Sequence, residues 1–288
     1  MKPKILILQA TGTNRDPDAA AAIELAGGAP VVLHINALHV DPAHLHEYQM
    51  LVLPGGFSYG DALGAGRLLA ADMRWLFQEE MARFVDAGKP VIGICNGFQA
   101  LVKSGWLPFP PPLSSPPVGG TDVARRLHSP RLHFSSPPVG GTEGGRATLT
   151  RNASNRFECR WVWLEPNPDS PCVFTRGLTE RIYCPVAHGE GRFVPRDEAV
   201  LAELRANGQI VVTYTTTDGN GPVDYPANPN GSTADIAGVC NPQGTIFGLM
   251  PHPEDHIFPE QHPRYARGER GNLGLSLFMQ GLRYAAEV

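Results

Sequence analysis

The chain contains one short apolar run that ends at a cysteine between two glycines and continues as a helix. Residues 91–94 (Val-Ile-Gly-Ile) have the length and β-branched content of a buried parallel strand, and residues 96–103 are typical of a helix. Cys95 lies at the junction. Gly93 and Gly97 occupy positions where a β-carbon would crowd such an elbow. The pattern predicts a nucleophile held in a strained backbone and still exposed.

Cys95 has two interpretations. A helix N-terminus favours negative charge, so the helix that follows Cys95 should favour the reactive thiolate over the thiol. Free cysteines are also among the most buried residue types, and a lone cysteine is commonly a core thiol. The glycines on both sides favour the nucleophile.

The pattern around the elbow alternates between strands and helices. Apolar runs at residues 5–8, 31–34 and 50–53 indicate strands, while residues 18–26 and 67–84 indicate helices. This alternation predicts an α/β fold with a doubly wound, mostly parallel central sheet. With 288 residues and 42% hydrophobic content, the chain can bury a full core, and we expect one domain over residues 1–288.

Charge and cysteine content narrow the function classes. The net charge of −4 and the absence of a Lys/Arg run disfavour nucleic-acid and membrane-surface binding. No apolar stretch reaches 18 residues and no secretory signal opens the sequence, so we expect a soluble cytoplasmic protein. The five cysteines include no CxxC pair, which fits reduced thiols better than disulfides or zinc.

The strand predicted at residues 50–53 runs directly into a glycine-rich turn, Pro-Gly-Gly-Phe-Ser-Tyr-Gly-Asp, at residues 54–61. Ligands bind at the carboxyl edge of such sheets. The turn contains neither the G-x-x-x-x-G-K-[ST] nor the G-x-G-x-x-G pattern, so it is not a phosphate-binding loop. We expect its backbone N–H groups to face Cys95 as an oxyanion site, the alternative being a plain strand-helix connection.

The last predicted strand, residues 244–250, ends in Pro-His-Pro-Glu. A neutral imidazole can take a thiol proton while a carboxylate fixes its tautomer, so His252 and Glu254 could serve Cys95 as base and orienting group. By itself a His-x-Glu sequence could equally be a surface turn. Position after a buried strand, together with the elbow cysteine, favours a catalytic triad.

Other segments carry weaker signals. Strands are predicted at residues 156–163, 185–193 and 210–217, followed by a loop at 218–232. His188 lies where the second of these strands breaks at glycines, either near the site or as a structural histidine. Four nearby histidines could suggest a metal, but they are divided between a strand end and a polar turn, and we expect no metal site. They are His34, His39, His44 and His46.

Residues 109–146 differ from the rest in composition. They are rich in Pro, Gly and Ser, and one eight-residue sequence occurs twice, at 114–121 and 135–142. Such a segment buries little apolar surface and is too long for an ordinary loop, so we expect an insertion. Because the segment contains four arginines, it could dock a partner protein. The alternative is a loop without a partner.

Taken together, these motifs resemble those of the class I, or triad, glutamine amidotransferases. Within that class they resemble the glutaminase subunit of phosphoribosylformylglycinamidine synthase. The fold implied is a flavodoxin-like three-layer sandwich. The matching stretches are residues 12–14, 54–61, 93–99, 160–162, 187–191, 228–232 and 248–254. The resemblance is silent on 109–146, and the family more often has Arg where this chain has Asp255.

The resemblance implies a role for each matching site residue. Cys95 would be the nucleophile, His252 its base and later its acid, and Glu254 the carboxylate that orients the imidazole. Backbone N–H groups of Gly56 and Asn96 would hold the oxyanion. The remaining expected glutamine-binding residues are Phe57, Gln99, His188, Gly189 and Glu190.

The reaction implied is hydrolysis of glutamine to glutamate and ammonia. A separate synthetase subunit with ATP and Mg²⁺ would use the ammonia to convert formylglycinamide ribonucleotide to formylglycinamidine ribonucleotide, in purine biosynthesis. The family also suggests a small third subunit, and no cofactor or metal on this chain. Two alternatives are a stand-alone cysteine hydrolase or chaperone of the same fold class and a regulatory protein without turnover. The intact triad disfavours the latter.

Overall fold

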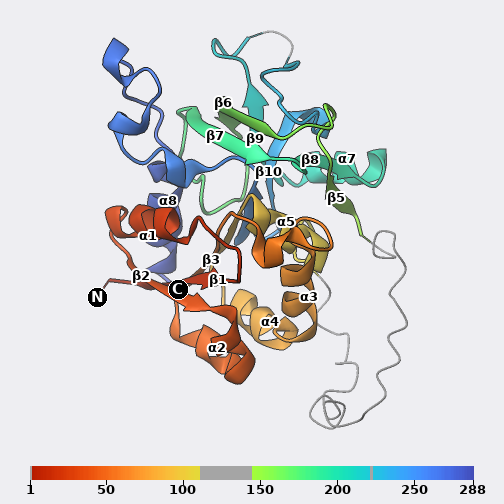
Figure 1. Cartoon of the computed structure of the whole chain (residues 1–288), viewed down its shortest axis with the longest axis vertical. Helices are drawn as coiled ribbons and strands as arrows, with labels where there is room; N and C mark the ends of the chain where they lie inside the picture. Colours follow the sequence, from red (N-terminus) through yellow and green to blue (C-terminus); the bar gives the residue numbers. More distant parts are fainter. Residues whose placement is uncertain (1, 111–144, 221–222) are drawn as a thin grey trace.

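The computed structural model describes residues 2–110, 145–220 and 223–288, and a nine-stranded sheet forms its centre (Figure 1). The strands of this sheet are β1 (Lys4–Gln9), β2 (Ala29–His34), β3 (Met50–Leu53), β4 (Val91–Ile94), β6 (Glu158–Pro166), β7 (Ile182–His188), β9 (Ile210–Thr215), β10 (Ile236–Cys240) and β11 (Ile246–Leu249). A separate pair is formed by β5 (Ala147–Thr150) and β8 (Arg192–Pro195).

The order of strands in the large sheet is β2-β1-β3-β4-β11-β10-β9-β6-β7. Neighbours from β2 to β11 pair in parallel, whereas those from β11 to β7 pair antiparallel. The predicted α/β class is confirmed, and the sheet is mixed. The expectation of parallel strands holds for the half that contains β4. β3, β4 and β11 are buried along their whole length, as expected of strands covered on both faces.

Helices cover both faces of the parallel half, with α1 and α8 on one side and α3, α4 and α5 on the other (Figure 1). Met50 and Leu53 of β3 show the two faces: Met50 lies against Gly281 of α8, and Leu53 lies against Gly97 of α5. The helices are α1 (Asp16–Leu25), α2 (Ile35–Val40), α3 (Arg67–Trp75), α4 (Gln78–Asp86), α5 (Asn96–Ser104), α7 (Glu198–Ala206) and α8 (Leu275–Ala285).

The single helix predicted at residues 67–84 is wrong, because two helices, α3 and α4, occupy this stretch. The backbone leaves the helical region at Phe77, which has φ −121° and ψ 9°. The break lets Phe77 bury its ring, which stacks on His39 with centroids 5.3 Å apart. Leu76, the residue before the break, is 44% exposed.

Most of the segment expected to be an insertion, residues 109–146, lies outside the described residues. Its two ends are described and belong to the packed fold. The Arg146 guanidinium lies 3.9 Å from the ring centroid of Phe109 and also pairs with Glu203 of α7. In the part of the chain described here, none of the helices has the length and apolar character needed to cross a membrane.

Candidate active site

Three adjacent parallel strands place the predicted site residues at one edge of the sheet. β4 pairs with β3 on one side and β11 on the other, with Gly93 opposite both Leu53 and Gly248. Because the three strands run in the same direction, the segments that follow them emerge together. These segments are the glycine-rich turn of 54–61, the elbow at Cys95 and residues 251–254.

The elbow has the strained backbone that its sequence predicts. Cys95 has φ 49° and ψ −101°, an unusual conformation for a residue with a side chain, and directly precedes α5. A β-carbon on Gly97 would lie 2.0 Å from the carbonyl oxygen of Leu53, and one on Gly93 would lie 2.8 Å from the backbone of Gly97. The predicted need for both glycines is confirmed.

The predicted exposure of Cys95 is wrong, because the residue is only 5% accessible. β7 covers it: the Sγ atom lies 3.8 Å from the carbonyl oxygen of Ala187. The backbone N–H of Cys95 donates to Leu249 at 2.8 Å, which fixes the elbow to β11. The Cys95 thiol is therefore held in a closed site beside the end of β11.

His252 and Glu254 form the expected pair. Nδ1 of His252 lies 2.7 Å from a carboxylate oxygen of Glu254, and both residues are at most 2% exposed. The backbone N–H of His252 donates to Pro185 of β7 at 2.8 Å. Since the carboxylate accepts from Nδ1–H, the other ring nitrogen, Nε2, is left as the proton acceptor.

The charges around the imidazole favour its protonated form. Burial disfavours a charged ring, but the Glu254 carboxylate and the Cys95 sulfur outweigh burial and raise the pKa of His252 well above its usual value. Burial and the neighbouring Glu254 raise the pKa of Asp255 to about 6. Arg15 lies 3.4 Å from Asp255 and partly offsets this crowding of carboxylates.

The double glycine that follows β3 makes room for the imidazole. A β-carbon on Gly55 would lie 2.6 Å from Cε1 of His252. Gly56 has φ 129° and lies beside Asn14 and Thr13, so a side chain there is excluded both by conformation and by space. Phe57, the next residue, is 46% exposed. The backbone of this turn therefore approaches His252 closely.

A hydrogen-bond network ties the glycine-rich turn to the start of α5. Oδ1 of Asn96 accepts from the N–H of Ser58 at 3.1 Å, and Nδ2 donates to Asp61 at 3.0 Å. Nδ2 of Asn96 also donates to Gln99 at 3.2 Å. The Gln99 amide nitrogen in turn donates to the carbonyl oxygen of Glu190 at 2.7 Å. Asn96 and Gln99 thus connect the turn after β3 with the turn after β7.

The turn after β7, residues 188–191, carries three predicted glutamine-binding residues, His188, Gly189 and Glu190. His188 is 3% exposed, and burial, assisted by the nearby His252, lowers the pKa of His188 to about 3. The Glu190 carboxylate lies 3.5 Å from Lys103, which also donates to Ala65. The structure therefore brings the turn to the same edge of the sheet as Cys95.

Two buried asparagines, neither of them among the predicted site residues, support this turn. The side chain of Asn152 contacts His188 and Gly191, and Nδ2 of Asn230 donates to the carbonyl oxygen of Gly191 at 2.9 Å. Asn230 lies within one of the matching motifs, residues 228–232. Nothing in the local sequence of Asn152 distinguishes it from an ordinary turn asparagine.

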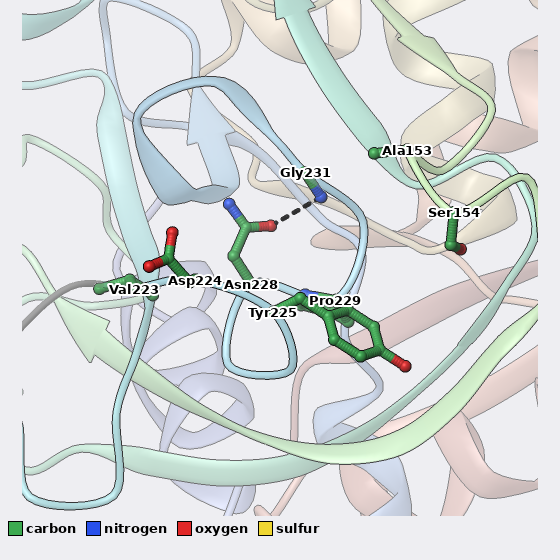
Figure 2. A pocket seen from close by; sticks show the side chains of 8 residues that line it. All are labelled: Ala153, Ser154, Val223, Asp224, Tyr225, Asn228, Pro229 and Gly231. Atoms are coloured by element: carbon green, nitrogen blue, oxygen red, sulfur yellow. Dashed lines mark hydrogen bonds between the residues drawn. The ribbon is translucent and has the colours of Figure 1, made fainter.

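A cavity of about 310 Å³ lies between the loop that follows Asn152 and the loop of residues 223–231 (Figure 2). Ala153 and Ser154 line one side and Tyr225 and Pro229 the other, while the N–H of Gly231 donates to Asn228 at 2.9 Å. Ala153 also donates to the carbonyl oxygen of Asn230 at 3.0 Å. The cavity thus lies beside the loops that support the turn after β7.

The four histidines near β2 have local roles. Nδ1 of His34 accepts from the N–H of Asn36 at the start of α2, and Nε2 of His46 contacts Glu80 at 2.5 Å. Over residues 2–110, 145–220 and 223–288, no group of three or more His, Cys, Asp or Glu side chains is arranged to hold a metal ion.

Fold and site together describe an α/β protein with a buried cysteine at a strand-helix elbow and a His-Glu pair at the same sheet edge. Comparison with known proteins shows the family. The model of the CobB/CobQ-like glutamine amidotransferase domain matches residues 2–285. The chain belongs to this family.

Relatives extend the match over the full length. A Treponema denticola protein named phosphoribosylformylglycinamidine synthase subunit PurQ is 45% identical, with 99% of both chains covered. A Dehalococcoides mccartyi protein of the same name is 44% identical, with 100% of this chain and 99% of that one covered. Among solved structures, PurLQS from Thermotoga maritima matches with a TM-score of 0.67 and 30% identity, covering 99% of both chains.

Proposed function

We infer that this chain is the glutaminase subunit of phosphoribosylformylglycinamidine synthase, an ATP-dependent carbon-nitrogen ligase of purine biosynthesis. It hydrolyses glutamine and passes ammonia to a synthetase subunit, which converts formylglycinamide ribonucleotide to formylglycinamidine ribonucleotide. Full-length relatives with this subunit name support the assignment. The observation that carries the chemistry is Cys95 at the elbow after β4, near enough to His252 to favour the charged imidazole, with Glu254 bonded to that ring.

In the first step, the Cys95 sulfur attacks the side-chain carbonyl carbon of glutamine. His252 takes the thiol proton, and Glu254 stabilises the imidazolium that forms. The raised pKa of His252 supports this role, since an ion pair with the thiolate is the form ready to react. The carbon-nitrogen bond then breaks, His252 gives the proton to the leaving nitrogen, and ammonia and a glutamyl thioester result.

In the second step, water hydrolyses the thioester. His252 accepts a proton from the water as its oxygen attacks the carbonyl carbon, the carbon-sulfur bond breaks, and glutamate leaves. Backbone N–H groups of Gly56 and Asn96 stabilise the oxyanion in both steps. The close approach of the double glycine to His252 supports this placement.

The turn of residues 188–191 and Phe57 hold the amino-acid part of glutamine. Gln99 supports Glu190 through its carbonyl oxygen, which suggests that Gln99 shapes this part of the site. The synthetase would bind ATP and Mg²⁺, and a small third subunit completes the complex. The similarity to the Thermotoga maritima structure, which is named PurLQS, supports such an assembly.

Two features of the structure bear on the fold type and on the location of the protein. The parallel half of the sheet has the strand order β2-β1-β3-β4-β11, which is the flavodoxin-like order, and helices lie on both faces. We therefore assign the whole chain to one flavodoxin-like three-layer domain. All five cysteines are free thiols, which supports a cytoplasmic location.

The test uses the complex with its synthetase. Cys95→Ala should abolish glutamine-dependent synthesis, while synthesis from added ammonia survives, because only the nucleophilic step is removed. Glutamine-dependent turnover that persists in Cys95→Ala would overturn the assignment. In the wild type, glutaminase activity of the isolated chain should be weak and rise on adding synthetase. Full activity in isolation would favour a stand-alone hydrolase.

A further inference from the structure

Asn152 is a buried side chain that joins three pieces of backbone. It is 1% exposed and lies on the loop after β5, far in sequence from the catalytic residues. Its Nδ2 donates to the carbonyl oxygens of His188 at 2.8 Å and Arg156 at 2.9 Å. Its Oδ1 accepts from the N–H of Gly191 at 2.9 Å. These partners hold both ends of the turn of residues 188–191.

The same contacts fix the protonation of the His188 ring. Two carbonyl oxygens face Nδ2 of Asn152 and one N–H faces Oδ1, so the orientation of the amide group is set. Nδ1 of His188 lies 3.2 Å from Oδ1, an acceptor, and must therefore carry the hydrogen. The pKa of His188 is lowered to about 3 by burial and by His252, which keeps the ring neutral. The neutral ring with hydrogen on Nδ1 has Nε2 as a bare acceptor.

Nε2 of His188 is buried and has no hydrogen-bond partner among the described residues. A buried acceptor without a partner is costly, so a donor is expected to reach it. The ring lies against the turn, where a β-carbon on Gly191 would stand 2.7 Å from Nε2. Ala187, the residue before His188, contacts Cys95. This acceptor therefore lies against the turn, and its ring is near enough to His252 for the two to interact.

We propose that Asn152 is a positioning residue for glutamine hydrolysis. It holds the turn of residues 188–191 in shape and holds the His188 ring so that Nε2 accepts a hydrogen bond from an N–H group of bound glutamine. This inference rests on the proposed function. The donor is either the α-ammonium group or the side-chain carboxamide of glutamine.

The first test is kinetic and uses the complex. Asn152→Ala should raise KM for glutamine about tenfold or more and change kcat much less, because the lost contacts serve the ground state and the transition state alike. Ammonia-dependent synthesis should not change. Asn241→Ala is the matched control, since Asn241 is also fully buried and bonded to its own hairpin, through Thr245 and Ile246. Equal KM values in the two variants would overturn the proposal.

The second test does not need Asn152 to be replaced. Imidazole ¹⁵N spectra of the Cys95→Ala chain, assigned with His188→Gln, should show His188 with hydrogen on Nδ1 and a free Nε2. Adding L-glutamine should shift the Nε2 signal. Hydrogen on Nε2 in the free chain would overturn the proposal.

Two further arms of the same experiment separate the possible donors and the possible failures. Glutaramic acid, which lacks the α-amino group, should still shift the Nε2 signal if the carboxamide is the donor, and should leave it in place if the α-ammonium group is. Glutamine that shifts the amide signals of Gly189 and Gly191 but not Nε2 would overturn this inference alone. Glutamine that shifts none of them would overturn the proposed function as well.

Discussion

Burial of neutral His188 should make the protein less stable in acid, and the size of the effect follows from its pKa. An unfolded histidine has a pKa of about 6.5, whereas that of His188 is about 3 in the folded chain. Between these values only the unfolded state binds the proton, so stability falls as the pH drops below 6.5. At about pH 5 the loss from this one residue is about 2 kcal/mol, and at about pH 8 it is negligible.

His188→Gln removes the titrating group and keeps a side chain able to hydrogen-bond. When the pH falls from about 8 to about 5, the wild type should therefore lose about 2 kcal/mol more of its free energy of unfolding than the variant does. Its Tm should fall by roughly 4 °C more than that of the variant. Differential scanning calorimetry of both proteins at several pH values measures this difference in Tm. His44→Gln, at a partly exposed histidine, controls for the loss of one imidazole. Parallel pH profiles for wild type and His188→Gln would refute the reasoning.

Two further predictions concern the elbow and the segment of unusual composition. Gly97→Ala should lower stability by about 1–3 kcal/mol or more, because its β-carbon would meet a backbone carbonyl of β3 at 2.0 Å. Gly271→Ala, with open space around it, is the control, and equal Tm values in the two variants would contradict the packing argument. Replacing residues 111–144 by a short Gly-Ser linker, with Phe109 and Arg146 kept as a packed pair, should preserve both Tm and glutamine-dependent turnover. A large loss of Tm would show that the segment contributes to the packed fold.

The positions of the candidate site residues could be predicted because each of these residues lies in a local motif at a strand end. Cys95, which lies between glycines, follows one short buried strand, and His252 and Glu254 follow another. Because these strands are parallel neighbours, their carboxyl ends lie at the same edge of the sheet. The bounds of β3 and β4 agree with those predicted from the sequence pattern. Buried parallel strands are short continuous apolar runs, and few other patterns compete with them.

The antiparallel half of the sheet was harder to predict. β10 is a five-residue strand with a glycine at its centre, and its pairing with β9 shifts register at Gly238. Such a strand has little periodicity to detect. The break between α3 and α4 was missed because the apolar spacing continues across it, and only the tertiary position of Phe77 decides where the helix ends.

The contacts by which Asn152 supports the turn after β7 could not be predicted from local sequence. Asn152 reaches partners 36 and 39 residues away, and Cys95 is buried by a strand 92 residues further along the chain. Long-range contacts of this kind depend on the arrangement of the complete sheet. No pattern in the residues around Asn152 or Cys95 encodes them.

The central claim is that Cys95 is the nucleophile of a glutamine-hydrolysing site. An electrophilic glutamine analogue with a diazoketone in place of the carboxamide should alkylate Sγ of Cys95, and mass spectrometry of peptides locates the adduct. Cys159 is the internal control, because it is an exposed thiol that is not among the predicted site residues. We predict one adduct, on Cys95, with excess L-glutamine slowing its formation. Labelling of Cys159 with Cys95 unmodified, or labelling of Cys95 that glutamine does not slow, would contradict the account.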